Sequence, residues 1–212
     1  MPTDPPRLYL ITPPISDWAA YASLFEAPVA ACGVACVLLR TTPALSGEGA
    51  NENTLQALLP LLQKHGVACL VANDPELAVR VNADGVHLED EGAELQSAVR
   101  SLQPAHIVGA GGLKTRDAAM AAGEAGVDYV MFGGPDSGEP QESITERVAW
   151  WAEIFNVPCV GYAHELSAIG DLVRAGADFI ALGDAVFADP RGAATALSEA
   201  ARLLSPAPEA VQ

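Results

Sequence analysis

With 212 residues, half of them hydrophobic, the chain is long enough to bury a sizeable core. Its formal net charge of -16 disfavours nucleic acid and anionic membrane surfaces as partners, and it repels phosphorylated ligands unless a basic pocket or a metal ion overrides it. No apolar run approaches the roughly 18 residues of a membrane span, and residues 1–7 lack the basic segment followed by an apolar one that is typical of a signal peptide. These features predict a soluble, cytoplasmic protein that acts on a small molecule.

Short apolar runs alternate with helix-like segments along the whole chain. The runs predicted to be strands cover residues 7–11, 35–39, 68–72, 85–88, 107–109, 129–132, 159–161 and 179–182. Helices are predicted over 16–26, 51–64, 75–81, 93–102, 115–125, from 143 onward, 166–175 and 190–204. Ser143 and Glu146 stand at capping-box spacing, and Thr115 can cap its own helix. The tail 205–212 is expected to be frayed.

The strand pattern indicates the fold class. Near-continuous apolar strands must be covered on both faces, and eight of them alternating with helices favour a closed (β/α)8 TIM barrel. We expect one domain over residues 1–212 with a core at about 7–204. A doubly wound open sheet is the alternative, but the loop after its first strand would be Thr12-Pro13-Pro14, which lacks the glycines of a phosphate loop.

Two further patterns point to structure rather than chemistry. An Asp precedes three of the predicted strands, as Asp84, Asp128 and Asp178, and glycines before two of these turns place the acids at the N-terminal, structural end of the strands. The four cysteines lie in or beside apolar runs without metal-ligand spacing, and are predicted to be buried free thiols.

Polar residues follow the third and fourth strands, where a parallel sheet would bring them together. Asn73 and Asp74 end one strand, and Asp90 and Glu91 follow the next. Carboxylates at neighbouring strand ends suit a divalent cation such as Mg²⁺. The alternative is that Asp74 caps the following helix and that residues 89–91 form a solvated turn. His87, within a strand, is predicted to be a packed core histidine.

The order of these segments resembles the thiamine phosphate synthase and thiazole tautomerase family. The matching pieces are Leu8-Tyr9-Leu10-Ile11-Thr12, the strand ending in Arg40, Ala72-Asn73-Asp74, Ala83-Asp84-Gly85-Val86-His87-Leu88, Asp128-Tyr129-Val130-Met131-Phe132-Gly133 and Gly176-Ala177-Asp178. The resemblance implies a (β/α)8 barrel. It also implies a transferase that joins a hydroxymethylpyrimidine diphosphate to a thiazole phosphate with Mg²⁺ and releases pyrophosphate.

Several family positions carry over. Arg40 matches the Arg of the family's Gln-x-Arg-x-Lys stretch, which holds the diphosphate, although the flanking Gln and Lys are Leu38 and Thr42 here. Asn73 matches the Asn that contacts the pyrimidine, and Asp74 matches an Asp that binds Mg²⁺.

The second metal-binding Asp of the family falls at Gly92 in this chain. The resemblance therefore leaves Asp90 and Glu91 as substitutes, with altered geometry, beside Asp74.

Other positions depart from the family pattern. Gly111 replaces a Ser that touches the diphosphate, and Lys114 is the nearby residue that could restore a positive charge. The loop over 135–140 lacks the family's Thr and Lys, and leaves Ser137 as a donor. Ala163 and His164 replace a Gly-Gly pair that lets the backbone approach the thiazole phosphate.

The phosphate site after the last strand also changes. Asp184 replaces a small Ser, so that a carboxylate stands beside the expected phosphate, although Asp184 could serve as a helix N-cap.

Three functions follow from this mixture. The chain is either a thiamine phosphate synthase-like transferase, a divergent barrel that is catalytically inactive or repurposed to bind another small ligand or a partner, or a thiazole tautomerase-like isomerase in which His164 or Lys114 moves a proton. In each case a homo-oligomer is possible.

Overall fold

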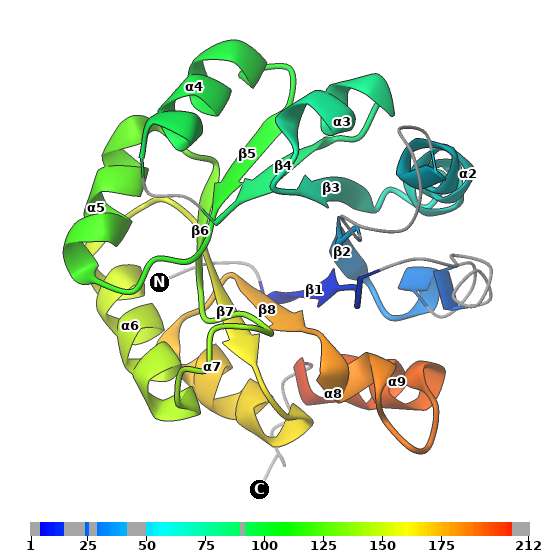
Figure 1. Cartoon of the computed structure of the whole chain (residues 1–212). Helices are drawn as coiled ribbons and strands as arrows, with labels where there is room; N and C mark the ends of the chain where they lie inside the picture. The colour runs from blue at the N-terminus through cyan, green and yellow to red at the C-terminus, as the bar shows by residue number, and fades with distance from the viewer. Residues whose placement is uncertain (1–4, 15–23, 26–28, 42–49, 90–91, 205–212) are drawn as a thin grey trace, which may run out of the picture.

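The computed structural model describes residues 5–14, 24–25, 29–41, 50–89 and 92–204, and within them the strands close into a barrel. Each strand pairs in parallel with its neighbours in the chain, and β1 closes the barrel by pairing with β8 (Figure 1). The strands are β1 (Arg7–Ile11), β2 (Val34–Leu39), β3 (Ala68–Ala72), β4 (Gly85–Leu88), β5 (Ile107–Ala110), β6 (Tyr129–Phe132), β7 (Cys159–Ala163) and β8 (Phe179–Leu182).

Helices lie outside the barrel and connect successive strands (Figure 1). They are α2 (Ala50–Gln63), α3 (Pro75–Arg80), α4 (Ala93–Leu102), α5 (Arg116–Ala125), α6 (Gln141–Ile154), the 3-10 turn η1 (Leu166–Ala168), α7 (Ile169–Ala175), α8 (Asp184–Phe187) and α9 (Ala193–Leu204). The alternation confirms the predicted (β/α)8 barrel. Parallel strands need crossover connections of this kind, since a tight turn cannot join them.

The apolar strands are continuous because both of their faces are buried. One set of side chains fills the barrel interior, with Leu38, Leu70, Met131 and Val160 among them. The alternate set packs against the helices and forms the larger core of the protein. A substitution of either set by a polar residue would therefore leave an unpaired group in an apolar layer.

All eight predicted strands are present, with bounds that differ by at most two residues, and the larger differences lie in the helices. α6 begins at Gln141 after Pro140, without a side-chain cap, so the capping box predicted at Ser143 was wrong. Proline suits the residue before a helix because its φ is fixed and it needs no hydrogen bond from its nitrogen. The last helix begins at Ala193 rather than at 190, and the short helix α8 precedes it. The predicted helix 16–26 and the tail 205–212 lie largely or wholly outside the described residues.

The three aspartates that precede strands make the same contact. Oδ2 of Asp84 accepts a hydrogen bond from the backbone N–H of Cys69, at 2.8 Å. Asp128 and Asp178 do the same for the N–H groups of Val108 and Cys159, each at 2.8 Å. In each case the carboxylate ties the start of one strand to the start of the strand before it. The predicted structural role of these acids is confirmed.

The cysteines are free thiols, as predicted. Cys36, Cys69 and Cys159 are buried, whereas Cys32 is partly exposed. Burial raises the pKa of the Cys159 thiol to about 12, so this group stays protonated at neutral pH. Of the helices within the described segments, none has the length and apolarity needed to cross a membrane.

Candidate active site

Two adjoining pockets open at the C-terminal ends of the strands, the end at which barrel enzymes place their chemistry. The first has a volume of about 590 Å³ and is bounded by residues that follow β1, β2, β3, β4 and β6. The second, of about 430 Å³, lies between the segments after β5 and β6. Glu89 and Asp136 line both pockets, which makes the two one divided cavity.

Arg40 is the cation of the first pocket. It directly follows β2, and its backbone N–H donates to Oγ1 of the buried Thr12, at 3.0 Å. This bond connects the ends of β1 and β2 and fixes where the Arg40 side chain starts. The guanidinium pairs with Asp136, from the segment after β6. The Arg40 side chain is 23% exposed and that of Asp136 74%, so the pair stands at the edge of the cavity.

Asn73 and Asp74 end β3 and line the first pocket together. Asn73 has a φ of 54°, a left-handed conformation that Asn tolerates better than most residues. Its Oδ1 accepts from the backbone N–H of Glu89, at 2.8 Å, and thereby ties the ends of β3 and β4 together. With Oδ1 engaged, the Asn73 amide nitrogen is the part of the side chain that can donate to a ligand.

Asp74 caps α3. Its Oδ1 accepts from the N–H of Leu77, at 2.8 Å, which confirms the capping alternative raised from the sequence. Capping occupies one carboxylate oxygen, and the group also lines the first pocket. Asp90 and Glu91, the other predicted metal ligands, lie outside the described residues. In the part of the chain that is described, no cluster of three or more His, Cys, Asp or Glu side chains could hold a metal ion.

His87 is the buried polar residue of the cavity floor, 2% exposed, as predicted for a core histidine. Its Nδ1 lies 2.8 Å from the hydroxyl of Tyr129, which in turn lies 2.9 Å from the hydroxyl of Tyr9. The imidazole also stacks on the Tyr129 ring. Burial lowers the pKa of His87 to about 4, so the ring is neutral at pH 7.

Gly111 has a steric reason to lack a side chain. A Cβ built on its backbone would lie 2.4 Å from Nε2 of His87, closer than atoms can approach. The imidazole thus fills the space that a Ser at this position would need. A Ser at this position would therefore require the His87 imidazole to shift.

The second pocket contains Lys114 and Ser137, both predicted site residues. Lys114 is exposed and precedes Thr115, whose hydroxyl caps α5 as predicted, accepting from Ala118 N–H at 3.1 Å. The Ser137 hydroxyl donates to the Gly134 carbonyl, at 3.0 Å, and so shapes its own loop. The structure places Lys114 and Ser137 in one pocket and Arg40 in the adjoining one.

The loop after β6 is fixed by a second ion pair. Arg147 of α6 lies 2.6 Å from Oε1 of Glu139, and its guanidinium also donates to the Leu113 carbonyl. His164, at the end of β7, directs Nε2 to the Glu139 carbonyl at 2.8 Å. His164 thus lies next to the loop and is not among the residues that line either pocket. Two acidic residues of this loop are therefore held by arginines, Asp136 by Arg40 after β2 and Glu139 by Arg147 of α6.

The ends of β7 and β8 meet at Tyr162 and Gly183. A Cβ on Gly183 would lie 3.0 Å from the Tyr162 hydroxyl, so the phenol fills this corner. Burial, and then the charge of Asp184, raise the pKa of Tyr162 to about 12. Asp184 is the first residue of α8, and Gly183 occupies the N-cap, so the predicted N-cap role of Asp184 was wrong. A carboxylate in the first turn still faces the positive end of the helix.

Sequence reasoning did not select Glu89 and Asp136 as site residues, although both line the two pockets. Glu89 directly follows β4, and a position directly after a strand is the feature of the sequence that could have identified it as a site residue. The pairing of Asp136 with Arg40 joins residues 96 positions apart, which no local pattern reveals.

The chain is similar to a family model and to several known proteins. A family model described as "Thiamine monophosphate synthase" matches residues 8–186. The thiamine-phosphate synthase of Rhodospirillum centenum is 38% identical over 205 residues, which cover 93% of this chain and 97% of that protein. The thiamine-phosphate synthase of Hyphomonas neptunium is 34% identical, with 90% of each chain covered.

Solved structures agree on the fold. A thiamine phosphate pyrophosphorylase from Pyrococcus furiosus superposes with a TM-score of 0.77 at 22% identity, over 93% of this chain and 95% of that one. A 3-hexulose-6-phosphate synthase superposes with a TM-score of 0.73 at 18% identity, over 93% of this chain and 100% of that one. At these identities the likeness concerns the barrel alone.

Proposed function

The chain belongs to the thiamine monophosphate synthase family, and we propose that it joins a hydroxymethylpyrimidine diphosphate to a thiazole phosphate, releasing pyrophosphate. The observation that carries the proposal is the shared pocket of Arg40, Asn73 and Asp74, three residues from neighbouring strand ends at the C-terminal mouth of the barrel. Each matches a family position, and each is held in place by a hydrogen bond of its backbone or its side chain.

Displacement of pyrophosphate requires positive charge around the leaving group and fixed donors around the pyrimidine. Arg40 would give its guanidinium to the diphosphate after releasing Asp136. The Asn73 amide nitrogen would donate to the pyrimidine ring, with Oδ1 already fixed by Glu89. The neutral imidazole of His87, at the floor of the first pocket, would present its edge to the bound substrate without adding charge. Lys114, from the second pocket, would be a further cation for the phosphate groups.

The first pocket offers carboxylates to a Mg²⁺ ion, which phosphate-handling enzymes bind through one or two carboxylates together with substrate oxygens. Asp74 and Glu89 line the same pocket and would hold the ion, with Asp90 or Glu91 as the further ligands expected from the sequence. The ion would supply positive charge to the diphosphate. Glu89 has the additional task of holding Asn73 through its backbone N–H.

The departures from the family pattern are part of the proposal. Asp136 on Arg40 and Asp184 at the start of α8 put negative charge where phosphate groups would bind. At about 4 Å, two like charges cost roughly 4 kcal/mol at an effective dielectric of 20. We therefore expect a divergent active site with weak affinity for phosphorylated substrates, in a cytoplasmic enzyme that could form homo-oligomers.

The decisive experiment measures pyrophosphate release and thiamine phosphate formation from both precursors with Mg²⁺. The wild-type protein should release pyrophosphate only when both precursors are present. Arg40→Gln should lower kcat/KM by at least tenfold, because it removes the guanidinium from the diphosphate. Arg100→Gln, which removes an equal charge on the surface of α4, is the matched control. Absence of turnover at high enzyme concentration would contradict the proposal.

One observation favours a second candidate, a barrel of the same descent that binds a neutral or cationic ligand. The cation of the first pocket is already paired with a carboxylate of its own chain, and Glu89 adds a further acid there. Saturable binding of thiazole phosphate in a calorimeter would count against this candidate. A tautomerase-like isomerase remains a third candidate, with Lys114 or His164 as its base and His164 engaged by the Glu139 carbonyl. Full isomerase activity in His164→Ala would exclude that residue as the base.

A further inference from the structure

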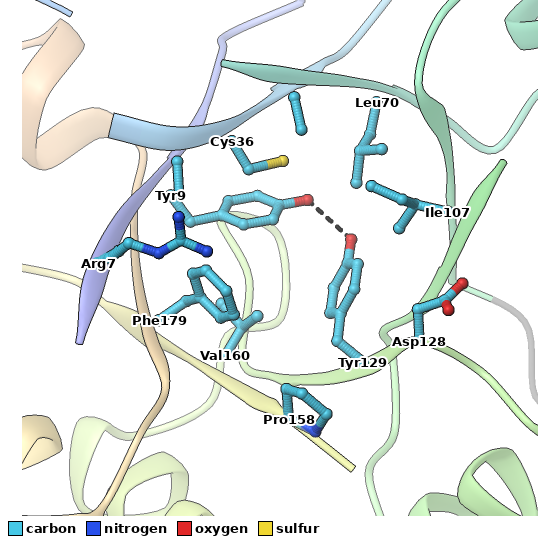
Figure 2. Close-up of a pocket in the computed structure, with 12 residues that line it drawn as sticks. Arg7, Tyr9, Cys36, Leu70, Ile107, Asp128, Tyr129, Pro158, Val160 and Phe179 are labelled. Atoms are coloured by element: carbon cyan, nitrogen blue, oxygen red, sulfur yellow. Dashed lines mark hydrogen bonds between the residues drawn. The ribbon is translucent and has the colours of Figure 1, made fainter. Parts of the chain in front are cut away.

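The opposite, N-terminal end of the barrel holds a separate cavity of about 230 Å³, which we call the basal pocket (Figure 2). Tyr9 and Tyr129 form its inner wall, and Arg7, Asp128 and Pro158 stand at its mouth. The three mouth residues are exposed, so the pocket is open to solvent. In another protein, an apolar cavity of about 150 Å³ admits benzene, so the basal pocket is large enough for a substituted aromatic ring.

The pocket exists because small residues stand where barrels place bulky ones. The inside of a (β/α)8 barrel is normally filled by layers of branched side chains. At the start of β2 and β3 this chain has Ala35 and Ala68, which leave the lower layer incomplete. The remaining walls are apolar, with Leu70, Val160 and Phe179 among them. A cavity of this kind favours an apolar ligand over water.

The inner wall is aromatic and hydrogen-bonded. The Tyr9 and Tyr129 rings meet edge to face, with centroids 5.9 Å apart, and their hydroxyls bond to each other across the barrel (Figure 2). Because Tyr129 also bonds to His87, this wall separates the basal pocket from the cavity at the other end. The aromatic rings of Tyr9, Tyr129 and Phe179 line the pocket and offer surfaces against which another aromatic ring packs well.

The mouth carries one available positive charge. The guanidinium of Arg7 lies 5.1 Å from the centre of the Phe179 ring, and Figure 2 shows the two side by side. Among the described residues, no carboxylate lies within ion-pair distance of Arg7. Asp128, on the other side of the mouth in Figure 2, is engaged by the Val108 N–H and by Gln103, at 2.8 and 2.9 Å.

We propose that the basal pocket is a binding site for a small aromatic carboxylate, with its ring between the tyrosines and Phe179 and its carboxylate on Arg7. The site is independent of the proposed transferase reaction, since the Tyr9 and Tyr129 wall separates it from Arg40 and Asn73. Arginine suits a carboxylate because its planar donors can bind both oxygens at once.

Calorimetry with benzoate and with its neutral analogue benzamide tests the site. The titrations use about 0.15 M salt, where the Debye length is about 8 Å and the overall acidity of the chain is screened. Benzoate should bind about fivefold more tightly than benzamide, the preference expected of one partly exposed ion pair. Arg7→Gln should remove this preference, and Arg100→Gln on α4 should keep it.

Ala68→Leu should weaken both compounds at least tenfold, because the added side chain fills the pocket. A cooperative thermal transition would show that Ala68→Leu is folded. If Ala68→Leu does not fold, the comparison of Arg7→Gln with wild type tests the proposal. Arg40→Gln should leave benzoate binding unchanged, because Arg40 lies at the other end of the barrel. The proposal is overturned if benzoate at about 10 mM fails to bind. It is equally overturned if Arg7→Gln retains the preference, if folded Ala68→Leu binds normally, or if Arg40→Gln abolishes binding.

Discussion

The guanidinium of Arg40 and the carboxylate of Asp136 form an ion pair across the candidate active site, between the ends of β2 and β6. Arg40 is also the cation of the first pocket that matches a diphosphate-binding position of the family. A ligand phosphate and Asp136 therefore compete for the same group. Four expected outcomes follow from this pair and from the buried contacts beneath it.

Asp136→Asn should lower the KM for the pyrimidine diphosphate by about 1.4-fold to fivefold. The change removes the competing charge, and exposed ion pairs of this kind are worth about 0.2 to 1 kcal/mol. Steady-state kinetics at fixed thiazole phosphate measures the effect. Asp171→Asn, whose partner Arg174 lies on α7, is the matched control. An unchanged or higher KM in Asp136→Asn would show that Arg40 is not the diphosphate ligand.

Asp178→Ala should lower the free energy of unfolding by about 1 to 3 kcal/mol, the cost of leaving a buried donor unpaired. The donor is the N–H of Cys159, which bonds to the Asp178 carboxylate at 2.8 Å. Urea unfolding measures the change, and Asp171→Ala should fall within about 0.5 kcal/mol of wild type as a surface control. Equal stability of Asp178→Ala and wild type would refute the structural role of this acid.

Gly111→Ser should destabilise the protein by about 1 to 3 kcal/mol through overpacking, even though it restores the family residue. The new Cβ would clash with Nε2 of His87. The hydrogen bond between Nδ1 of His87 and the Tyr129 hydroxyl holds this imidazole in place. In a double-mutant cycle, the cost of Gly111→Ser should shrink when His87 is replaced by Ala. Additive effects in this cycle would mean that the two residues do not share the space.

Acid should destabilise the protein through His87. Its pKa is about 4 when folded, because of burial, against 6.5 as a free side chain. Below pH 6.5 the unfolded chain therefore binds a proton that the folded chain does not, so stability falls as the pH is lowered towards 4. The contribution lost between pH 7 and pH 5 is about 2 kcal/mol.

Urea unfolding of wild type and His87→Gln across this range isolates the effect. His87→Gln should lack this loss of stability between pH 7 and pH 5, whereas His65→Gln, at an exposed position just after α2, should show it as wild type does. Parallel pH profiles of His87→Gln and wild type would show that the folded protein accommodates the charged imidazole.

The barrel could be predicted because its signals are local. Each strand is a short apolar run, and each helix between them shows its own spacing of apolar residues or its own cap, as at Thr115. The three aspartates were recognised as structural for the same reason, since each directly precedes a strand. Local patterns failed at α6, where Pro140 rather than Ser143 precedes the helix, and at the four-residue α8.

The candidate site could be predicted only in part, because it depends on contacts between distant segments. Arg40, Asn73 and Asp74 follow strands directly, and a position after a strand is visible in the sequence. The partner of Arg40 comes from a loop far along the chain, and the space beside Gly111 is taken by a side chain of β4. The single letter for glycine does not reveal which neighbour excludes a larger residue.

The three aspartate contacts separate the stability of the barrel from its function along the barrel axis. All of them lie at the starts of the strands, where Asp84, Asp128 and Asp178 each fasten two neighbouring strands together. Changes in the segments that follow the strands leave these fastenings intact. The opposite end of the barrel is thus free to vary, so that descendants of one scaffold can exchange ligands while the fold persists.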